Sequence, residues 1–184
     1  FRNRWGWTNP RGPEPIIEAG PSGNNFMSLT ADDANLEPLR NLPFLYRLGQ
    51  RYLYTEGTPD LLFTNNETNR ERVHPEGANH TPYVKDAFHR HIIDGEACVN
   101  PELYGTKACA HYVEQVPPGS SVVIRLRLTP ERLETPLVDV DAIIAKRKFE
   151  ADTFYGHVHP PHASEDEKLI QRQAFAGMLW TKQI

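Results

Sequence analysis

The densest group of polar side chains in the sequence lies in the run from Phe63 to Arg70. This run offers three amides, two hydroxyls, a carboxylate and a guanidinium. Amides and carboxylates supply hydrogen-bond donors and acceptors in fixed planes, which is the chemistry that binds sugar hydroxyls. The same residue types also cap loops by bonding back to the backbone. Taken alone, the residues favour this loop-capping interpretation.

Histidines form the second group with chemical potential. His157, His159 and His162 could be metal ligands, because imidazole nitrogens commonly bind zinc. However, the two prolines before His162 stiffen the segment, and no cysteine or carboxylate lies at supporting spacing. His89 and His91 are two residues apart on a predicted helix, so their side chains diverge by about 200°. The sequence therefore predicts a solvated linker at 157–162, no metal site and no cofactor.

Acid–base catalysis would need two carboxylates facing one cleft, about 5–9.5 Å apart in a glycosidase. The chain has 24 acidic residues, but the obvious group, 165–167, is explained by helix capping. The sequence contains no nucleophile elbow, phosphate loop, zinc-binding helix motif or glycine-rich dinucleotide turn. No catalytic residue can be chosen from spacing.

The composition and net charge limit the classes of partner that the chain is expected to bind. With 39% apolar residues, 24% charged residues and a net charge of −4, the chain is typical of a soluble globular protein. The small net charge argues against nucleic acid, and no apolar run reaches the ~18 residues that span a membrane. Cys98 and Cys109 are too few for a disulfide framework. We expect two free thiols in a reducing compartment, with the cytoplasm preferred.

The elements that must position these residues are mainly strands. A hairpin pattern joins 51–55 to 61–64 around the turn 57–60, and a second hairpin is predicted from 106 to 128 around 117–120. In the second one, alternation places the apolar side chains from Val122 to Leu128 on one face, and points Arg125 and Arg127 away from it. An apolar face needs cover, so we expect a mainly β fold, an antiparallel β-sandwich.

Helical spacing appears in three places. A short helix is predicted near 82–94, with Thr81 as N-cap and Gly95 as its end. A longer one follows Asp139 through Val158, and Ser164 opens a capping box. That last helix is apolar almost all round in its second half and is expected to run to the end of the chain. Such a helix is normally buried among others, so we expect a segment of a larger protein.

Several stretches together resemble one family, the glucosidase-like proteins of glycoside hydrolase family 63, relatives of processing mannosyl-oligosaccharide glucosidase. The resemblance covers nearly the whole chain and is loose only at 10–50. The stretches that carry it are 1–7, 61–69, 82–89, 105–108 and 171–183.

The resemblance implies a β-sandwich joined through linker helices to a toroidal (α/α) barrel that hydrolyses α-glycosidic bonds with inversion. It implies residues 1–130 as a partial sandwich with the short inserted helix, 131–163 as the linker helix and its Pro/His-rich loop, and 164–184 as the first barrel helix. Both catalytic carboxylates of the family lie in the barrel, so none is assigned here. The segment alone is expected to be inactive. Its expected partners are the sugar substrate, through the full-length protein, and its own helical domain.

Under this resemblance, two polar patches are expected to face the barrel and shape the sugar pocket or the domain interface, and one residue of the last helix could approach the same pocket. The predicted substrate-binding residues are Asn66, Glu67, Asn69, Lys85, Asp86, His89 and Trp180. The alternative is a stand-alone β-sandwich module that binds carbohydrate or a protein. The apolar last helix favours the glycosidase, because a free-standing module would not expose such a surface.

Overall fold

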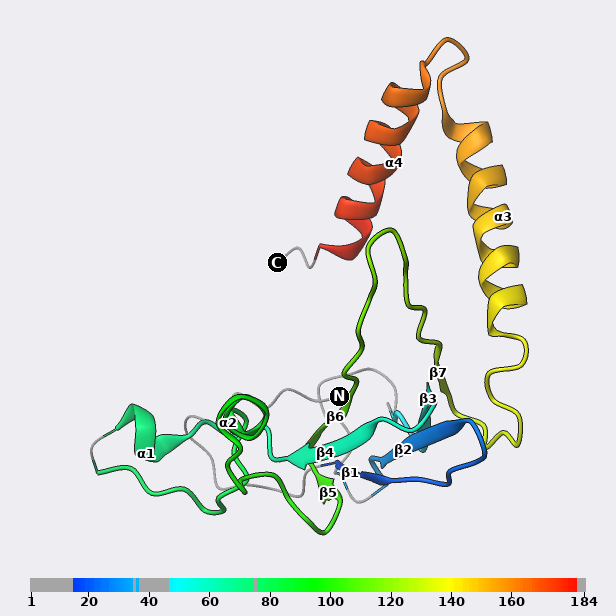
Figure 1. Cartoon of the computed structure of the whole chain (residues 1–184). Helices are drawn as coiled ribbons and strands as arrows, with labels where there is room; N and C mark the ends of the chain where they lie inside the picture. The colour runs from blue at the N-terminus through cyan, green and yellow to red at the C-terminus, as the bar shows by residue number, and fades with distance from the viewer. Residues whose placement is uncertain (1–14, 35, 37–46, 75, 182–184) are drawn as a thin grey trace. The chain divides into compact units, whose positions relative to one another are not determined.

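The computed structural model describes residues 15–34, 36, 47–74 and 76–181, and the chain divides into two compact units, Phe1–Leu137 and Val138–Ile184 (Figure 1). The resemblance at residues 1–7 lies outside the described residues. Within these described ranges, the first unit contains every strand, and the second contains two helices. The predicted mainly β fold with C-terminal helices is therefore confirmed at this level.

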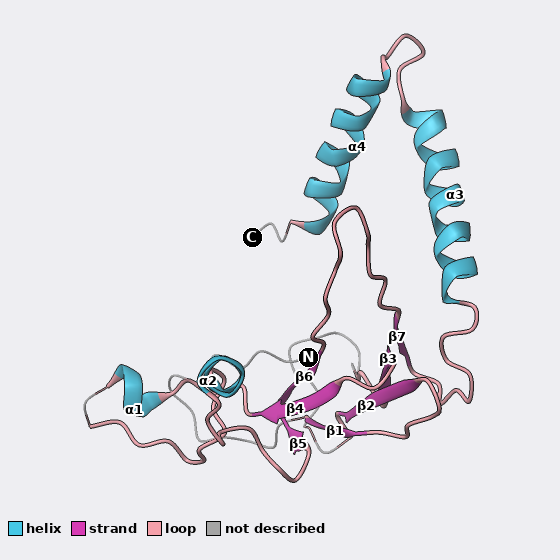
Figure 2. Cartoon of the chain, viewed as in Figure 1, coloured by secondary structure: helices cyan, strands magenta, loops and turns pink. Residues whose placement is uncertain are grey.

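The strands of the first unit form two antiparallel sheets (Figure 2). The larger sheet has the order β5-β1-β2-β3-β7, and its strands are β1 (Ile16–Ala19), β2 (Phe26–Asp32), β3 (Arg51–Glu56), β5 (Tyr104–Gly105) and β7 (Leu126–Thr129). The smaller sheet pairs β4 (Asp60–Thr64) with β6 (Lys107–His111).

Both predicted hairpins are wrong, although their strands exist. β3 and β4 follow each other in sequence, but β3 pairs with β2 and β7, whereas β4 pairs with β6. The strands β6 and β7 likewise enter different sheets, and 112–125 contains no strand. Gly57 has a left-handed φ of +73° at the point where the chain leaves one sheet for the other. Pairing partners are thus chosen across long sequence separations, which local turn signals do not report.

The apolar face predicted from Val122 to Leu128 is not buried. Leu126 and Leu128 are 54% and 61% exposed. The two arginines that alternate with these leucines are less exposed: Arg125 pairs with Glu56 at 3.2 Å, and Arg127 donates to the carbonyl of Pro136 at 3.2 Å. The alternation of side chains along this segment was predicted correctly. However, the polar partners of the two arginines leave the arginine face less exposed than the leucine face.

Tyrosines dominate the inner side of the larger sheet. Tyr54 is fully buried, stacks on Tyr52 with ring centroids 6.0 Å apart, and meets Phe26 edge to face at 5.5 Å. The hydroxyl of Tyr54 accepts the backbone N–H of Leu133 at 2.8 Å, so its buried oxygen is satisfied.

A carboxylate closes the loop between β2 and β3. Asp33 accepts the backbone N–H groups of Leu48 at 2.7 Å and Gly49 at 2.8 Å. Burial alone would raise the pKa of Asp33, but these two donors and the nearby guanidinium of Arg47 lower it below its ordinary value. Hydrogen bonds to the charged form therefore decide its ionisation.

The described part of the first unit also contains the helices α1 (Arg70–Val73) and α2 (Ala87–Asp94). Gly95 ends α2 in a left-handed conformation, as predicted. The predicted start is wrong, because the helix begins at Ala87. The hydroxyl of Thr81 accepts from the amide of Asn65 at 3.3 Å and caps no helix. The hydroxyl of Thr81 is therefore engaged in a long-range hydrogen bond instead of the local cap that the sequence pattern predicts.

The second unit is a helical hairpin of α3 (Val140–Val158) and α4 (Glu165–Trp180). The Ser164 capping box is formed in both directions, as predicted. The helix does not run to the chain end as predicted, because Thr181 is extended. No helix in the described ranges is long and apolar enough to cross a bilayer.

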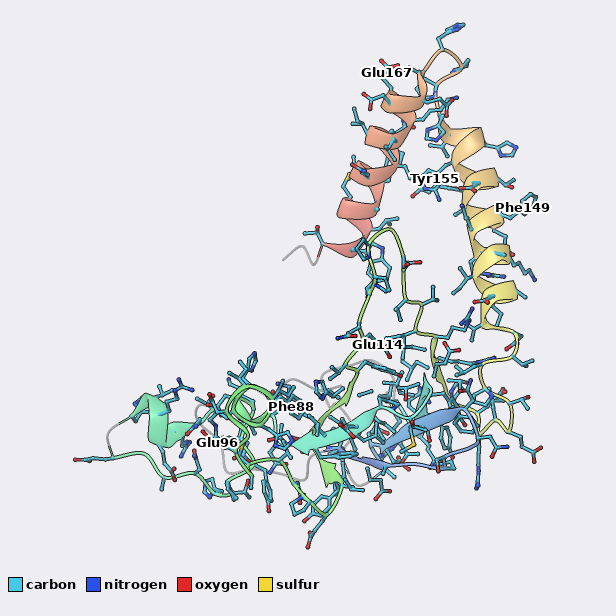
Figure 3. The ribbon with its side chains drawn as sticks, in the orientation of Figure 1. Phe88, Glu96, Glu114, Phe149, Tyr155 and Glu167 are labelled. Atoms are coloured by element: carbon cyan, nitrogen blue, oxygen red, sulfur yellow. The ribbon has the colours of Figure 1, made fainter. Side chains whose placement is uncertain are left out.

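Side chains join α3 to α4. Arg172 pairs with Asp152 at 2.6 Å and lies 4.8 Å over the ring of Tyr155, which also stacks against Phe175 at 6.4 Å (Figure 3). His159 bonds to a side chain of α4 at 2.6 Å. Because the two helices make specific contacts with each other, they form a unit in their own right.

Candidate functional site

Two polar segments, 65–69 and 81–86, lie against each other at the end of β4. The N–H of Asn65 donates to the carbonyl of Tyr83 at 2.9 Å, and the N–H of Lys85 donates to the carbonyl of Glu67 at 2.9 Å. The buried hydroxyl of Thr64 donates to a carbonyl of the second segment at 2.8 Å. We call these two segments the paired loops. Main-chain bonds hold them together, so their side chains are presented from a defined backbone.

Asn69 is the centre of the paired loops. Its Oδ1 accepts the N–H of Arg72 at 3.3 Å, which caps α1, and also accepts from Nδ2 of Asn79 at 2.9 Å. Its own Nδ2 donates to Asp86 at 3.1 Å. The side-chain amide of Asn69 thus bonds to three other residues. An asparagine suits this position because its side chain can donate and accept hydrogen bonds at the same time.

Asp86 is held by cations as well. Arg72 lies 3.4 Å and Arg90 3.7 Å from its carboxylate, and Arg90 also pairs with Glu96 at 2.6 Å. Burial acts to lower the pKa of Arg90, but its acidic partners raise it overall. The carboxylate of Asp86 is thus engaged by an amide and lies beside two guanidiniums, so Asp86 is suited to positioning rather than to proton transfer.

A third segment, at the start of β6, supports the paired loops. The hydroxyl of Thr106 accepts the N–H of Asn66 at 2.8 Å. Lys107 donates to the carbonyl of Lys85 at 3.1 Å and lies 4.9 Å over the ring of Phe88, which is labelled in Figure 3. Residues 106–107 therefore hydrogen-bond to both of the paired loops.

The structure brings together most of the predicted site residues. Five of them lie in the paired loops, and His89 lies on the first turn of α2 with an exposed side chain. The ammonium of Lys85 donates to Thr68 at 3.0 Å. Trp180 is 89% exposed and belongs to the second unit, whereas the other six predicted residues belong to the first. Binding of a sugar by these residues stays a prediction.

Sequence reasoning missed the supporting residues Asn79, Thr106 and Gly105. Their partners lie between eight and about forty residues away, so no local pattern identifies Asn79 or Thr106. Gly105 is buried, and a Cβ there would overlap the carbonyl oxygen of Thr64. Gly105 directly precedes the hairpin predicted from 106 to 128, and a glycine beside a predicted strand is the one signal that could have pointed to this close approach.

A cavity of about 360 Å³ lies elsewhere in the first unit, where the turn after β3 meets the segments that follow β6 and precede β7. Its acidic residues are Glu56, Asp60 and Glu114, and its lining is completed by 57–59, 111–113 and 122–124. Glu56 is engaged by Arg125, whose backbone N–H it also accepts at 2.9 Å.

The remaining candidate chemistry is limited. Among residues 15–34, 36, 47–74 and 76–181, no group of three or more histidine, cysteine or acidic side chains could hold a metal ion. Cys98 and Cys109 are free thiols, as predicted, and Cys109 is half-buried rather than buried. Burial raises the pKa of both thiols. Raised pKa values disfavour the thiolate, so neither cysteine is set up as a nucleophile.

Comparison with known proteins gives a similarity over the whole chain. No family model matches the sequence, and no solved structure matches it. The chain is 32% identical, over 209 aligned residues, to the uncharacterised protein YMR196W of Saccharomyces cerevisiae. The aligned region is 100% of this chain and 19% of the yeast protein. The chain therefore resembles one region of a considerably longer yeast protein.

Proposed function

We propose that this chain is a non-catalytic portion of an inverting α-glycosidase related to glycoside hydrolase family 63. The observation that carries the proposal is the meeting of three stretches of the family resemblance, 61–69, 82–89 and 105–108, at one place. They are far apart in sequence but joined by direct hydrogen bonds at the paired loops and the start of β6. Motif residues that converge in space are better explained by a shared site than by independent loops.

In this proposal, the paired loops form one wall of the sugar pocket or of the interface with the catalytic domain. The exposed groups are the amide of Asn66, the ammonium of Lys85 and the imidazole of His89, and the half-buried carboxylate of Glu67 lies beside them in sequence. Such groups recognise hydroxyls through oriented hydrogen bonds. The network around Asn69 and Asp86 keeps the loops in one conformation, so the entropy of ordering them is not lost again when substrate binds.

The second unit is proposed to begin the helical barrel. The exposed apolar residues of α4 include Met178, Leu179 and Trp180, which are 65%, 80% and 89% exposed. An apolar helix surface of this kind favours packing against further helices, and argues against a free-standing module.

Chemistry would come from a carboxylic acid and a carboxylate base outside this chain. In an inverting enzyme the acid protonates the leaving oxygen while the base activates a water on the opposite face of the sugar. Asp86 is assigned neither role, because its oxygens are engaged by Asn69 and two arginines.

The test uses the complete gene product with a panel of α-linked disaccharides. We expect release of the monosaccharide, with the β-anomer appearing first by NMR, because inversion converts an α-linkage to a β-product. Asn66→Ala combined with Asp86→Ala should lower kcat/KM or stability, whereas Asn24→Ala, at an exposed turn, should change neither. A folded complete protein that hydrolyses no α-glycoside would refute the proposal.

A second experiment distinguishes the glycosidase from the alternative, a stand-alone module that binds carbohydrate. The isolated 184-residue chain should release no sugar from any of these substrates, because both catalytic groups are proposed to lie elsewhere. Glycan binding by the isolated chain, together with an inactive complete protein, would replace the glycosidase by a carbohydrate-binding module.

A further inference from the structure

One end of the smaller sheet holds the segment that leads into α2 at two consecutive carbonyls. Thr64 of β4 and Lys107 of β6 are a register pair, so their side chains lie on the same face of this sheet. The hydroxyl of Thr64 donates to the carbonyl of Val84 at 2.8 Å, and the ammonium of Lys107 donates to the carbonyl of Lys85 at 3.1 Å. The smaller sheet therefore fixes the backbone of the second paired loop just before α2 begins.

Lys107 makes a second contact with the same region. Its ammonium lies 4.9 Å from the centroid of the Phe88 ring, on the first turn of α2 (Figure 3 labels Phe88). A cation over an aromatic face is attracted by the ring quadrupole. Lys107 thus reaches residues on both sides of Asp86, the residue that precedes the helix. Its half-buried side chain links β6 to the backbone of 85 and to the side chain at 88.

Lys85 is the cation of the paired loops, and it is exposed. Its N–H donates to the carbonyl of Glu67 at 2.9 Å, and its carbonyl accepts from Lys107, so its backbone is held from two sides. Its ammonium donates to the hydroxyl of Thr68 at 3.0 Å. An ammonium carries three N–H donors, and this bond uses one of them. The ammonium of Lys85 is therefore held in place while it keeps donors for a ligand.

Holding this lysine in place has an energetic consequence. A lysine head group sits on a flexible four-carbon stem. A long side chain that becomes ordered only when a ligand binds loses conformational entropy, and this loss weakens binding. The contacts to Glu67, Thr68 and Lys107 order Lys85 before a ligand arrives.

We propose that Lys107 is a positioning residue of the sugar site, and that it acts on the sugar through Lys85. Lys85 donates to a hydroxyl of the sugar, and Lys107 holds Lys85 where that bond forms. The inference rests on the proposed function, because it takes the paired loops as a wall that contacts the sugar. Neither lysine takes part in bond cleavage. Their contribution is the same in the ground state and the transition state, so it affects KM and leaves kcat unchanged.

Steady-state kinetics of the complete gene product on an α-linked disaccharide that it hydrolyses tests this. Lys107→Met keeps a long side chain but removes its N–H donors and its charge. It should raise KM about 3- to 10-fold, as expected for the loss of one hydrogen bond, at constant kcat. Lys107→Arg should return KM close to its original value, because a guanidinium also donates to a carbonyl and lies over an aromatic ring. Lys146→Met, at an exposed lysine of α3, is the control and should change neither constant.

A double-mutant cycle shows whether Lys107 acts through Lys85. Lys85→Met should raise KM at least as much as Lys107→Met, and the variant with both substitutions should have the KM of Lys85→Met alone. Effects that multiply in the double variant would overturn the inference. So would a fall in kcat at constant KM, since that indicates loss of folded enzyme and not loss of positioning.

The same measurements separate the two proposals. An unchanged KM for Lys107→Met in an active glycosidase overturns the role of Lys107 and leaves the proposed function standing. A folded complete protein that hydrolyses no α-glycoside overturns the proposed function, and the role of Lys107 with it.

Discussion

Gly105→Ala should disrupt the support of the paired loops. Gly105 ends β5 and is buried against the end of β4. A Cβ at this position would overlap the carbonyl oxygen of Thr64 and lie 2.9 Å from its carbonyl carbon and 3.2 Å from its nitrogen. These are backbone atoms, which cannot rotate away as the end of a side chain would. The strands must therefore separate.

The magnitude follows from two terms. Overpacking of a buried position costs about 1–3 kcal/mol. Separation also weakens the bond from the N–H of Thr106 to the carbonyl of Thr64, now 3.1 Å long, which adds about 1 kcal/mol. The smaller backbone entropy of alanine in the unfolded chain offsets about 0.4–1 kcal/mol. We expect Gly105→Ala to lower the free energy of unfolding of the first unit by roughly 2–3 kcal/mol.

Urea unfolding of the 184-residue chain, followed through the NMR amide signals of Leu62 and Phe63 in β4, measures this loss. With a slope of about 2 kcal/mol/M, the midpoint should fall by roughly 1–1.5 M. The amide signal of Asn66 should also shift, because its partner is the hydroxyl of Thr106.

Gly156→Ala is the matched control. A Cβ at Gly156 on α3 meets nothing within 4 Å, so alanine should stabilise that helix by about 0.5–1 kcal/mol. The α3 amide signals report it. A loss below about 0.5 kcal/mol for Gly105→Ala, or the same sign for both variants, would refute the reasoning from close approach.

Three further outcomes are expected. Asn69→Ala should lower the stability of the first unit by about 2 kcal/mol, because it removes a helix cap and a bond to a carboxylate, whereas Asn24→Ala should stay within about 0.5 kcal/mol; equal urea midpoints would contradict this. Asp33→Asn should cost about 2 kcal/mol at pH 7, because the lowered pKa makes its stabilisation complete above the unfolded value near 4. That difference should fade as the pH drops through the folded-state pKa, and a difference independent of pH would count against the two backbone donors. The thiols Cys98 and Cys109 should react with a disulfide reagent at pH 8 at least about ten-fold more slowly in the native chain than in urea, and equal rates would contradict their burial.

Local patterns predicted the helices of the second unit well. Val140–Val158 has both predicted ends, and Ser164 forms its capping box. These signals act within a few residues, since a cap bonds to the next turn and helical periodicity repeats every 3.6 residues. The start of α2 was wrong because Thr81 bonds to Asn65, sixteen residues earlier.

Strand existence was predictable, but strand partners were not. The residues of β3, β4 and part of β7 were recognised from alternation and β-branched side chains. Their pairing depends on register across the sheet, to which the turn 57–60 gives no reliable guide. The apolar positions at Leu126 and Leu128 were placed on one face, but the partners of Arg125 and Arg127 decided which face is less exposed.

By itself, the sequence determined which side chains near Asn69 and Asp86 are polar, where the long helices begin, and that strands alternate. The tertiary structure decided that these two residues share one network, that Gly105 must lack a side chain, and that 112–125 contains no strand. The physical reason is range. Periodicity and caps depend on neighbours within about one turn, whereas pairing, close approach and burial depend on residues that only folding brings together.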